Sequence, residues 1–184
     1  MDGSKQGDSS ERYIFSLLGV KTSFATRKPG VPTTVRLTKS GHRVNRLEYD
    51  FVNAPDLAQT IVCTCCALGV PFHFTGLQTL KIKETDRIVA LKTELGKLGY
   101  QIEDVNGSEL RWDGKKSPNT QHPSPITQHP SPIDTYEDHR MALAFAPMSM
   151  KLGSVSINNP HVVTKSYPRY WEDLNSAGFT IESV

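Results

Sequence analysis

The sequence has no long apolar stretch and no strong excess of charge of either sign. No run approaches the roughly 18 apolar residues that a membrane-spanning helix requires, and residues 1–5 lack the apolar core of a signal peptide. The 21 Lys and Arg residues against 19 Asp and Glu residues leave a net charge of +2, without the basic face typical of nucleic-acid-binding proteins. We therefore expect a protein that contacts neither a membrane nor a nucleic acid.

Cysteine is scarce, and its spacing suits neither a zinc site nor a disulfide framework. Cys63, Cys65 and Cys66 fall within four residues of one apolar segment, whereas zinc sites use separated pairs of ligands and secreted frameworks use an even number of cysteines. We expect three buried thiols in a reducing, cytoplasmic environment. We expect neither a metal ion nor a cofactor.

Charge is concentrated in one heptapeptide, Lys81-Ile82-Lys83-Glu84-Thr85-Asp86-Arg87, which holds five charged residues. Apolar residues then recur at spacings of three and four from Ile88 to Leu98, which indicates an amphipathic helix with Thr85 or Asp86 as its N-cap. The heptapeptide therefore precedes and enters a helix.

A helix start is also a place where anions bind, because its backbone N–H groups are unpaired and the helix dipole is positive there. Lys83 and Arg87 would reinforce such a site. Glu84 has two interpretations, an acid or base in the same site or a plain ion-paired residue at the helix start.

The sequence contains a second copy of this arrangement. Asp56 precedes Lys83 by 27 positions (83 − 56), and Asp138 precedes Lys165 by 27 positions (165 − 138). In both copies the aspartate is at the start of an apolar helix, and a second predicted helix follows the lysine. That second helix ends in a similar six-residue sequence in each copy, Leu-Gly-Tyr-Gln-Ile-Glu at 98–103 and Ala-Gly-Phe-Thr-Ile-Glu at 177–182. This repetition predicts one supersecondary module used several times, with two Asp/Lys pairs facing one site. An aspartate at a helix start is more commonly a cap, so position alone leaves both roles open.

Periodicity and turn signals predict the other elements. A short helix follows a capping box formed by Asp8 and Glu11, and Asn106-Gly107 predicts a hairpin turn. The predicted strands are 20–24, 34–38, 46–51, 71–75, 77–82, 100–105, 109–112, 155–157 and 179–181. The predicted helices are 54–68, 86–98, 141–150 and 168–174.

Residues 114–133 interrupt the pattern with a duplication. The heptapeptide Thr-Gln-His-Pro-Ser-Pro-Ile occupies 120–126 and again 127–133. Prolines deny backbone donors and hold extended shapes, which predicts an exposed loop. We expect His122 and His129 to be solvent-exposed and to ligate nothing.

Residues 134–140 form a second charged segment, Asp134-Thr135-Tyr136-Glu137-Asp138-His139-Arg140, at the entry to the next apolar helix. His139 is the side chain in this segment that suits proton transfer near neutral pH. The alternative is a histidine that merely satisfies its charged neighbours.

Three segments taken together, 80–87, 135–142 and 165–171, resemble the carboxyl-terminal motifs of the 5-enolpyruvylshikimate-3-phosphate synthase family. Asn53-Ala54-Pro55-Asp56 fits the Pro-Asp pair of that family. The resemblance extends over the chain outside the duplicated loop. It is carried by the order and spacing of the motifs as well as by each motif.

The resemblance implies an inside-out α/β barrel built from repeated βαβαββ units, with two domains and an active site in the cleft between them. Residues 1–43 would be the end of the first, shikimate-side domain, and 44–184 the carboxyl-terminal part of the second. The amino-terminal half of such an enzyme would be missing. We therefore expect the isolated chain to be inactive.

The resemblance also implies a reaction, the transfer of the enolpyruvyl group from phosphoenolpyruvate to the 5-hydroxyl of shikimate 3-phosphate with release of phosphate. This step belongs to the shikimate pathway of aromatic amino acid biosynthesis. Asp56 would accept the hydroxyl proton, and Glu84 and His139 would assist proton transfer at the reacting carbons.

The remaining family positions would bind the two substrates. Lys83 would bind shikimate 3-phosphate, and Thr79 stands where the family commonly has an asparagine that contacts this substrate. Arg87 and Arg140 would hold the carboxylate of phosphoenolpyruvate, and Lys165 would lie on its phosphate side. Two anionic substrates held together require several convergent cations, which agrees with this assignment.

Two other interpretations remain open at this point. One is a related transferase that shares the module, either the enolpyruvyl transferase acting on a UDP-sugar or the RNA-phosphate cyclase. The other is a non-catalytic module that binds anions. The Lys-Glu-Thr-Asp-Arg segment at 83–87 and the Asp-His-Arg segment at 138–140 favour the shikimate enzyme.

Overall fold

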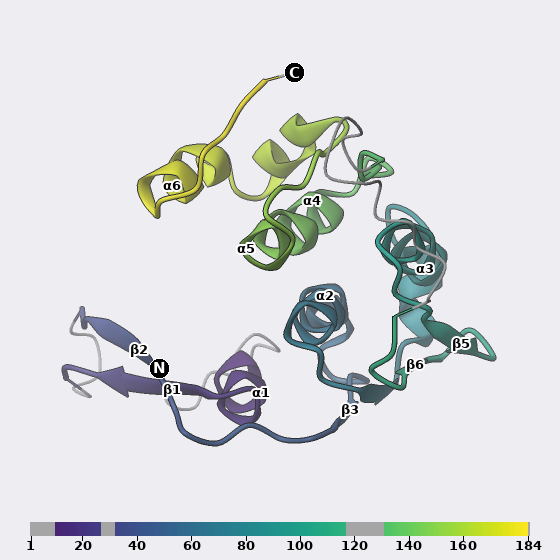
Figure 1. The fold of residues 1–184 in the computed structure, drawn as a ribbon, viewed down its shortest axis with the longest axis horizontal. Coiled ribbons are helices and arrows are strands. Elements are labelled where there is room, and N and C mark those ends of the chain that lie inside the picture. Colours follow the sequence, from purple (N-terminus) through teal and green to yellow (C-terminus); the bar gives the residue numbers. More distant parts are fainter. Residues whose placement is uncertain (1–9, 27–31, 117–130, 184) are drawn as a thin grey trace.

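The chain follows an open arc, from the two strands at 20–24 and 35–39 through the helix at 11–17, the sheet strands between 47 and 112 and the helix at 87–97 to the helices between 139 and 176 (Figure 1). This computed structural model describes residues 10–26, 32–116 and 131–183. Asp8 of the expected capping box, His122, His129 and most of the duplicated heptapeptide lie outside these ranges. The described chain is a mixed α/β structure.

The helices and strands are, in chain order, α1 (Glu11–Leu17), β1 (Val20–Phe24), β2 (Val35–Lys39), β3 (Leu47–Asp50), η2 (Pro55–Leu57), α2 (Ala58–Leu68), β4 (Phe72–Thr75), η3 (Gln78–Ile82), α3 (Arg87–Lys97), β5 (Glu103–Val105), β6 (Glu109–Trp112), α4 (His139–Phe145), η4 (Ala146–Met148), α5 (Ser149–Leu152), η5 (Pro160–Lys165) and α6 (Tyr170–Ser176).

The main sheet has four strands in the order β3-β4-β6-β5, with β3 and β4 parallel and the other pairs antiparallel. Alternation along β4 and β6 sends Phe72, Phe74, Leu110 and Trp112 to the buried face, as the period of two requires. The hairpin turn is confirmed, because Asn106 and Gly107 both have positive φ, 54° and 65°, which a tight hairpin favours.

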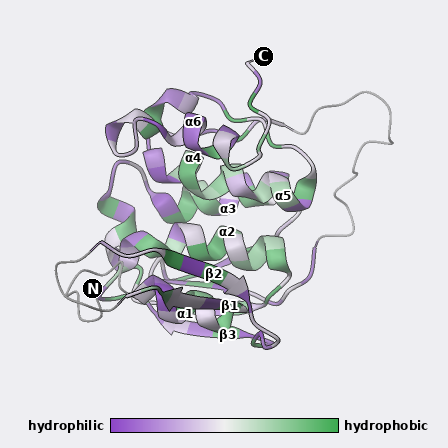
Figure 2. Cartoon of the chain, turned by 90° about the vertical axis from the view of Figure 1, so that its left-hand side faces the viewer, coloured by the Kyte–Doolittle hydropathy of each residue, from purple (hydrophilic) through white to green (hydrophobic). Residues whose placement is uncertain are grey.

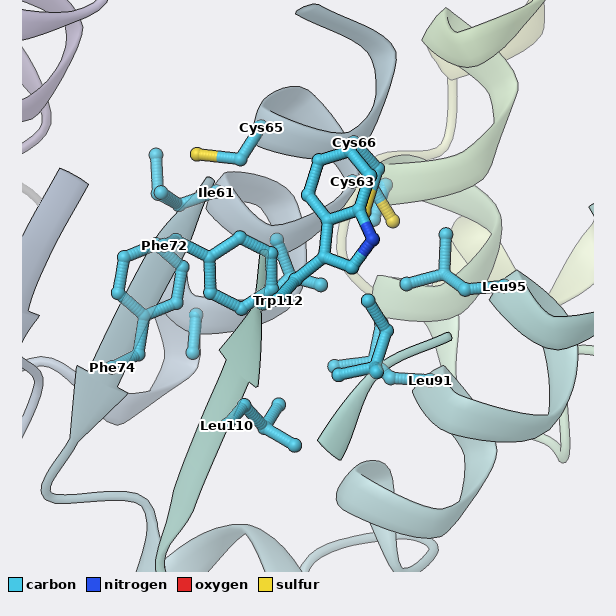
Figure 3. Close-up of a cluster of buried hydrophobic side chains, with 14 of the residues drawn as sticks. Ile61, Cys63, Cys65, Cys66, Phe72, Phe74, Leu91, Leu95, Leu110 and Trp112 are labelled. Carbon is cyan, nitrogen blue, oxygen red and sulfur yellow. The ribbon is translucent and has the colours of Figure 1, made fainter. Parts of the chain in front are cut away.

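Helix α2 covers the buried face of this sheet. Cys63, Cys65 and Cys66 are buried free thiols in this described segment, as the sequence predicts, and they lie in the cluster around Trp112 (Figure 3). Most residues of α2 are apolar (Figure 2). Leu68, at the end of the helix, is 40% exposed. Burial without a charged partner raises the pKa of the Cys65 thiol to about 12, so this thiol is unreactive at neutral pH.

Helix α3 matches its prediction closely. The Asp86 carboxylate accepts hydrogen bonds from the backbone N–H groups of Ile88 and Val89, both at 3.1 Å. The helix therefore begins at an aspartate cap. Its apolar stripe, including Leu91 and Leu95, is fully buried.

Three predicted strands are wrong. Residues 78–82 form the 3-10 helix η3 because the buried residues Leu77 and Leu80 are three positions apart, which fits one 3-10 turn rather than alternation. Residues 155–157 contribute a single bridge, Ile133 to Ile157. Residues 179–181 pair with no strand in the described part of the chain. A strand needs a neighbouring edge, which local sequence does not supply.

Helices α4 and α6 meet η5 in a second, smaller apolar cluster that contains Val163 and Tyr170. This cluster holds the end of the described chain against α4. Every helix in residues 10–26, 32–116 and 131–183 is too short or too polar to traverse a lipid bilayer.

Helices α2 and α4 pack against each other through a polar side chain, Gln59. Gln59 is fully buried, its Nε2 donates to the Met141 sulfur at 3.3 Å, and its Oε1 has no hydrogen-bond partner among the described residues. A buried unsatisfied acceptor costs about 1–3 kcal/mol. We expect Gln59→Met, which has nearly the same volume, to raise the free energy of unfolding by about 1 kcal/mol or more, measured by urea denaturation.

The matched control for this substitution is Gln101→Met, at an exposed position. It should change the free energy of unfolding by less than about 0.5 kcal/mol. A loss of stability in Gln59→Met would contradict the prediction and would mean that the amide is satisfied in solution.

Candidate functional site

Four segments that are distant in sequence supply the candidate site. Asp56 comes from η2, Lys83 and Glu84 from the turn between η3 and α3, and Lys165 from the end of η5. The fourth segment is the start of α4, which supplies Asp138, His139 and Arg140. The charged motifs of the sequence predicted these segments, and the fold brings them together.

Arg87 lies at the centre of this group, and its side chain is only 2% exposed. Its Nε donates to Asp138 Oδ2 at 2.6 Å and its Nη2 to Asp138 Oδ1 at 3.3 Å. Its Nη1 donates to Asp56 Oδ1 and its Nη2 to Glu84 Oε2, both at 2.8 Å. One guanidinium thus connects three carboxylates from three segments by charge-assisted hydrogen bonds.

Asp56 also receives two further cations. Lys83 Nζ lies 3.2 Å from Asp56 Oδ1, and Arg140 Nη2 lies 3.7 Å from Asp56 Oδ2. Burial alone would raise the pKa of Asp56, but Arg140, Lys83 and Arg87 outweigh it, and the pKa falls below its usual 3.8. Asp56 is therefore ionised at neutral pH, and its side chain is 40% exposed to an approaching ligand.

Glu84 lies between Arg87 and Lys165, whose Nζ is 3.7 Å from Glu84 Oε1. A hydrogen bond from its own backbone N–H lowers the pKa of Glu84, and against the opposing effect of burial Arg87, Lys165 and His139 lower it further. Glu84 is also ionised at neutral pH. It is not the cap of α3, a role that Asp86 fills.

His139 begins α4 beside these carboxylates, with its side chain 12% exposed and its Nδ1 4.0 Å from Asp138 Oδ1. Nδ1 is buried and has no hydrogen-bond partner among the described residues. Burial lowers the pKa of His139 below 6.5, although Asp138 opposes the shift. The imidazole is therefore neutral near pH 7, with a ring nitrogen available for proton exchange.

Asp138 belongs to the second Asp/Lys pair of the repeat, but the family resemblance assigned it no role. It is completely buried and also caps α4, since Asp138 Oδ1 accepts from the backbone N–H of Arg140 at 2.9 Å. The 27-residue spacing of Asp56–Lys83 and Asp138–Lys165 is the sequence signal that points to it. The two pairs differ in the structure, because Lys165 reaches Glu84 rather than Asp138.

Thr79 is exposed in η3. Within the described part of the chain, no hydrogen bond joins it to the charged cluster. It is the predicted site residue that the fold does not tie to the others.

The cluster contains four cations against three carboxylates, so with His139 neutral it carries one positive charge (4 − 3). The cations are Lys83, Arg87, Arg140 and Lys165, and the carboxylates are Asp56, Glu84 and Asp138. Three of the four cations are partly exposed, with Lys165 the most open at 62%. An anionic ligand could therefore replace protein carboxylates as their partner.

This arrangement suits acid–base chemistry on an anionic ligand. Among the described residues no group of three or more His, Cys, Asp or Glu side chains is placed to hold a metal ion. The chain is therefore an α/β protein in which ionised carboxylates, a neutral imidazole and exposed cations lie in one cluster, with charges that suit an anionic ligand and proton exchange.

Comparison with known proteins identifies the family. The model of EPSP synthase (3-phosphoshikimate 1-carboxyvinyltransferase) matches residues 28–174. The chain is 53% identical over 179 residues to a 3-phosphoshikimate 1-carboxyvinyltransferase of Bacteroides fragilis, covering 97% of the chain and 40% of that protein. It is 31% identical over 170 residues to the enzyme of the same name from Syntrophobacter fumaroxidans, and this match covers 92% of the chain and 36% of that protein.

The chain belongs to the EPSP synthase family. It spans about 40% of the length of the Bacteroides fragilis relatives that it matches. The resemblance predicted from the charged motifs is confirmed.

Proposed function

We propose that this chain supplies one wall of a 3-phosphoshikimate 1-carboxyvinyltransferase site. The reaction transfers the enolpyruvyl group of phosphoenolpyruvate to the 5-hydroxyl of shikimate 3-phosphate and releases phosphate. The observation that carries the proposal is the convergence of Asp56, Glu84 and Arg140 on Arg87 and its neighbours, in a chain of this family.

The proton-transfer roles follow from the ionisation of these groups. Asp56 is an ionised carboxylate, so it can accept the proton of the attacking hydroxyl. The hydroxyl adds to C2 of phosphoenolpyruvate while C3 gains a proton, and the following loss of phosphate from C2 and of a proton from C3 leaves the enol ether. Glu84 and His139 interact electrostatically with each other, and we assign these two proton transfers at carbon to them. An acid or base positioned in this way raises the reaction rate because it transfers a proton in the transition state.

The cations have complementary roles. Arg140 presents a planar guanidinium at the edge of the cluster and suits the carboxylate of phosphoenolpyruvate, together with Arg87. Lys83 lies beside Asp56 and Lys165 lies beside Glu84. In these places the two lysines would bind the phosphate groups of the two substrates. Ligand binding would then draw cations from Asp56 and raise its pKa, which makes it a stronger base when substrate is present.

The complete site is proposed to lie in a cleft between two domains of an inside-out α/β barrel, with a boundary in this chain near residue 43. The exposed positions along all of β2 and the fraction of the relatives that the chain spans support a larger assembly. We propose that this chain alone binds anions weakly and does not turn over. In water each ion pair contributes at most about 1 kcal/mol, whereas a closed site would strengthen the same contacts.

A phosphate-release assay tests the proposal. The chain is assayed with both substrates by itself, and then mixed with the amino-terminal segment of the Bacteroides fragilis relative that the chain does not match. We expect no release by the chain alone and release in the mixture. UDP-N-acetylglucosamine replaces shikimate 3-phosphate in a parallel series, and release with the UDP-sugar alone, or in neither mixture, would overturn the proposal.

Arg140→Lys tests the carboxylate assignment. Lysine keeps the charge but loses the two-pronged geometry, so we expect the apparent constant for phosphoenolpyruvate to rise at least about tenfold, equivalent to about 1.4 kcal/mol. The constant for shikimate 3-phosphate should stay nearly unchanged. Both constants are measured by phosphate release in the mixture.

The control for this substitution is Arg46→Lys, at a half-exposed arginine directly before β3 that pairs with Glu48. It should alter neither constant. Equal weakening of both substrates by Arg140→Lys would refute a carboxylate-specific role for this arginine.

A further inference from the structure

Asp138 is a fully buried carboxylate for which the proposed chemistry has no direct use. It is shielded from solvent and contacts two arginines, the guanidinium of Arg87 and the backbone N–H of Arg140. A buried carboxylate is costly unless it is paired and hydrogen-bonded. The buried charge of Asp138 must therefore be balanced by the groups that it contacts.

The pairing uses one particular edge of the Arg87 guanidinium. A guanidinium has five N–H donors in a fixed planar fork. Asp138 takes the Nε–H and one N–H of Nη2, which fixes the plane of the group. The donors left on Nη1 and Nη2 point to Asp56 and Glu84, both of which are partly exposed.

The turn before Asp138 holds this carboxylate in place. Tyr136 and Glu137 both have positive φ, 54° and 58°, a conformation that costs energy for residues other than glycine and needs support from the surroundings. The Tyr136 hydroxyl donates to the buried Glu94 at 2.6 Å, and Asn159 Nδ2 donates to Glu137 Oε1 at 2.5 Å. Each of the two residues with positive φ is therefore held by a side-chain hydrogen bond.

We propose that Asp138 is a positioning residue: it locks the Nε edge of Arg87, so that the opposite edge faces Asp56, Glu84 and the bound anion. The same carboxylate orients the first turn of α4, and with it the side chains of His139 and Arg140. The identity of the anion rests on the proposed function, but the locking of Arg87 does not. Asp138 itself touches neither substrate.

Asp138→Asn is the decisive variant, because asparagine remains a good helix cap but cannot neutralise Arg87. The matched control is Asp86→Asn, the same change at the cap of α3, where the carboxylate accepts from Ile88 and Val89 and is not bonded to Arg87. Both variants are made in the 184-residue chain, and far-UV circular dichroism confirms that they fold.

The first measurement is hydrogen exchange at the Arg87 Nε–H, followed by 15N NMR and assigned by the signal that Arg87→Lys removes. The second is the dissociation constant for phosphoenolpyruvate by NMR titration of the same samples. We expect Asp138→Asn to exchange at least tenfold faster than wild type and to bind at least tenfold more weakly. Asp86→Asn should match wild type in both.

The outcomes separate this inference from the proposed function. If Asp138→Asn keeps wild-type exchange at Arg87 Nε–H, the positioning role is overturned, whatever the chain binds. If the wild-type chain binds no phosphoenolpyruvate but Asp138→Asn still accelerates the exchange, the positioning role stands and the proposed function loses support.

Asp138→Glu covers the case in which Asp138→Asn does not fold. Glutamate retains the charge, but its side chain is longer by one methylene group, so the carboxylate is shifted relative to the helix backbone. We expect this variant to fold, to retain slow exchange at Arg87 Nε–H and to bind phosphoenolpyruvate at least threefold more weakly, because the guanidinium is displaced. Unchanged affinity in Asp138→Glu would overturn the proposal.

Discussion

Replacing Arg87 by methionine is expected to lower the free energy of unfolding of the chain by about 3–5 kcal/mol. The substitution keeps a long apolar side chain but leaves the completely buried Asp138 without its guanidinium partner. Removing one member of a buried ion pair leaves an uncompensated charge in a medium of low polarity, which is why the loss is large. Urea denaturation followed by circular dichroism at pH 7 measures it.

Two further variants make this result interpretable. Arg169→Met removes an arginine that is 73% exposed and pairs with Glu172, and it should cost less than about 1 kcal/mol. The double variant Arg87→Met/Asp138→Asn should recover most of the lost stability, since no unpaired charge remains. A loss below about 1 kcal/mol in Arg87→Met would show that the buried pair does not stabilise the fold.

Asp56→Asn is expected to lower turnover by roughly 10²–10⁴-fold, with a much smaller effect on substrate binding. The carboxylate would act on a proton that moves only in the transition state, whereas Lys83 and Arg140 remain to bind the anions. Turnover is measured by phosphate release in the mixture described above.

Glu84→Gln provides the comparison within the same cluster. A loss of the same order is expected if Glu84 transfers protons at carbon. Asp113→Asn, at an exposed aspartate that pairs with Lys115, is the control and should retain full turnover. Wild-type turnover in Glu84→Gln would reduce this glutamate to an ion-pair partner of Arg87 and Lys165.

The sequence was most informative where local interactions decide the structure. The start of α3 follows from the Asp86 cap and a regular apolar stripe, and the hairpin turn follows from Asn106-Gly107, whose residues accept positive φ. The site was also visible, because the motifs around Lys83 and His139 have fixed spacing and a known family pattern. The sequence could therefore indicate which residues meet.

Local pattern failed where a segment depends on a partner elsewhere in the chain. Residues 78–82 alternate poorly and close a 3-10 turn over two buried leucines, and residues 179–181 find no neighbouring strand in the described chain. An extended segment becomes a strand only if a free sheet edge lies beside it. That edge is set by the path of the whole chain.

The sequence by itself indicated the family, the start of α3 and most members of the charged cluster. Only the tertiary structure decided that Arg87 is buried, that Asp138 is its partner across 51 residues, and that Lys165 turns to Glu84. The physical reason is that caps and periodicity act within a few residues. The pairing of a buried charge depends instead on which distant groups the fold removes from water together.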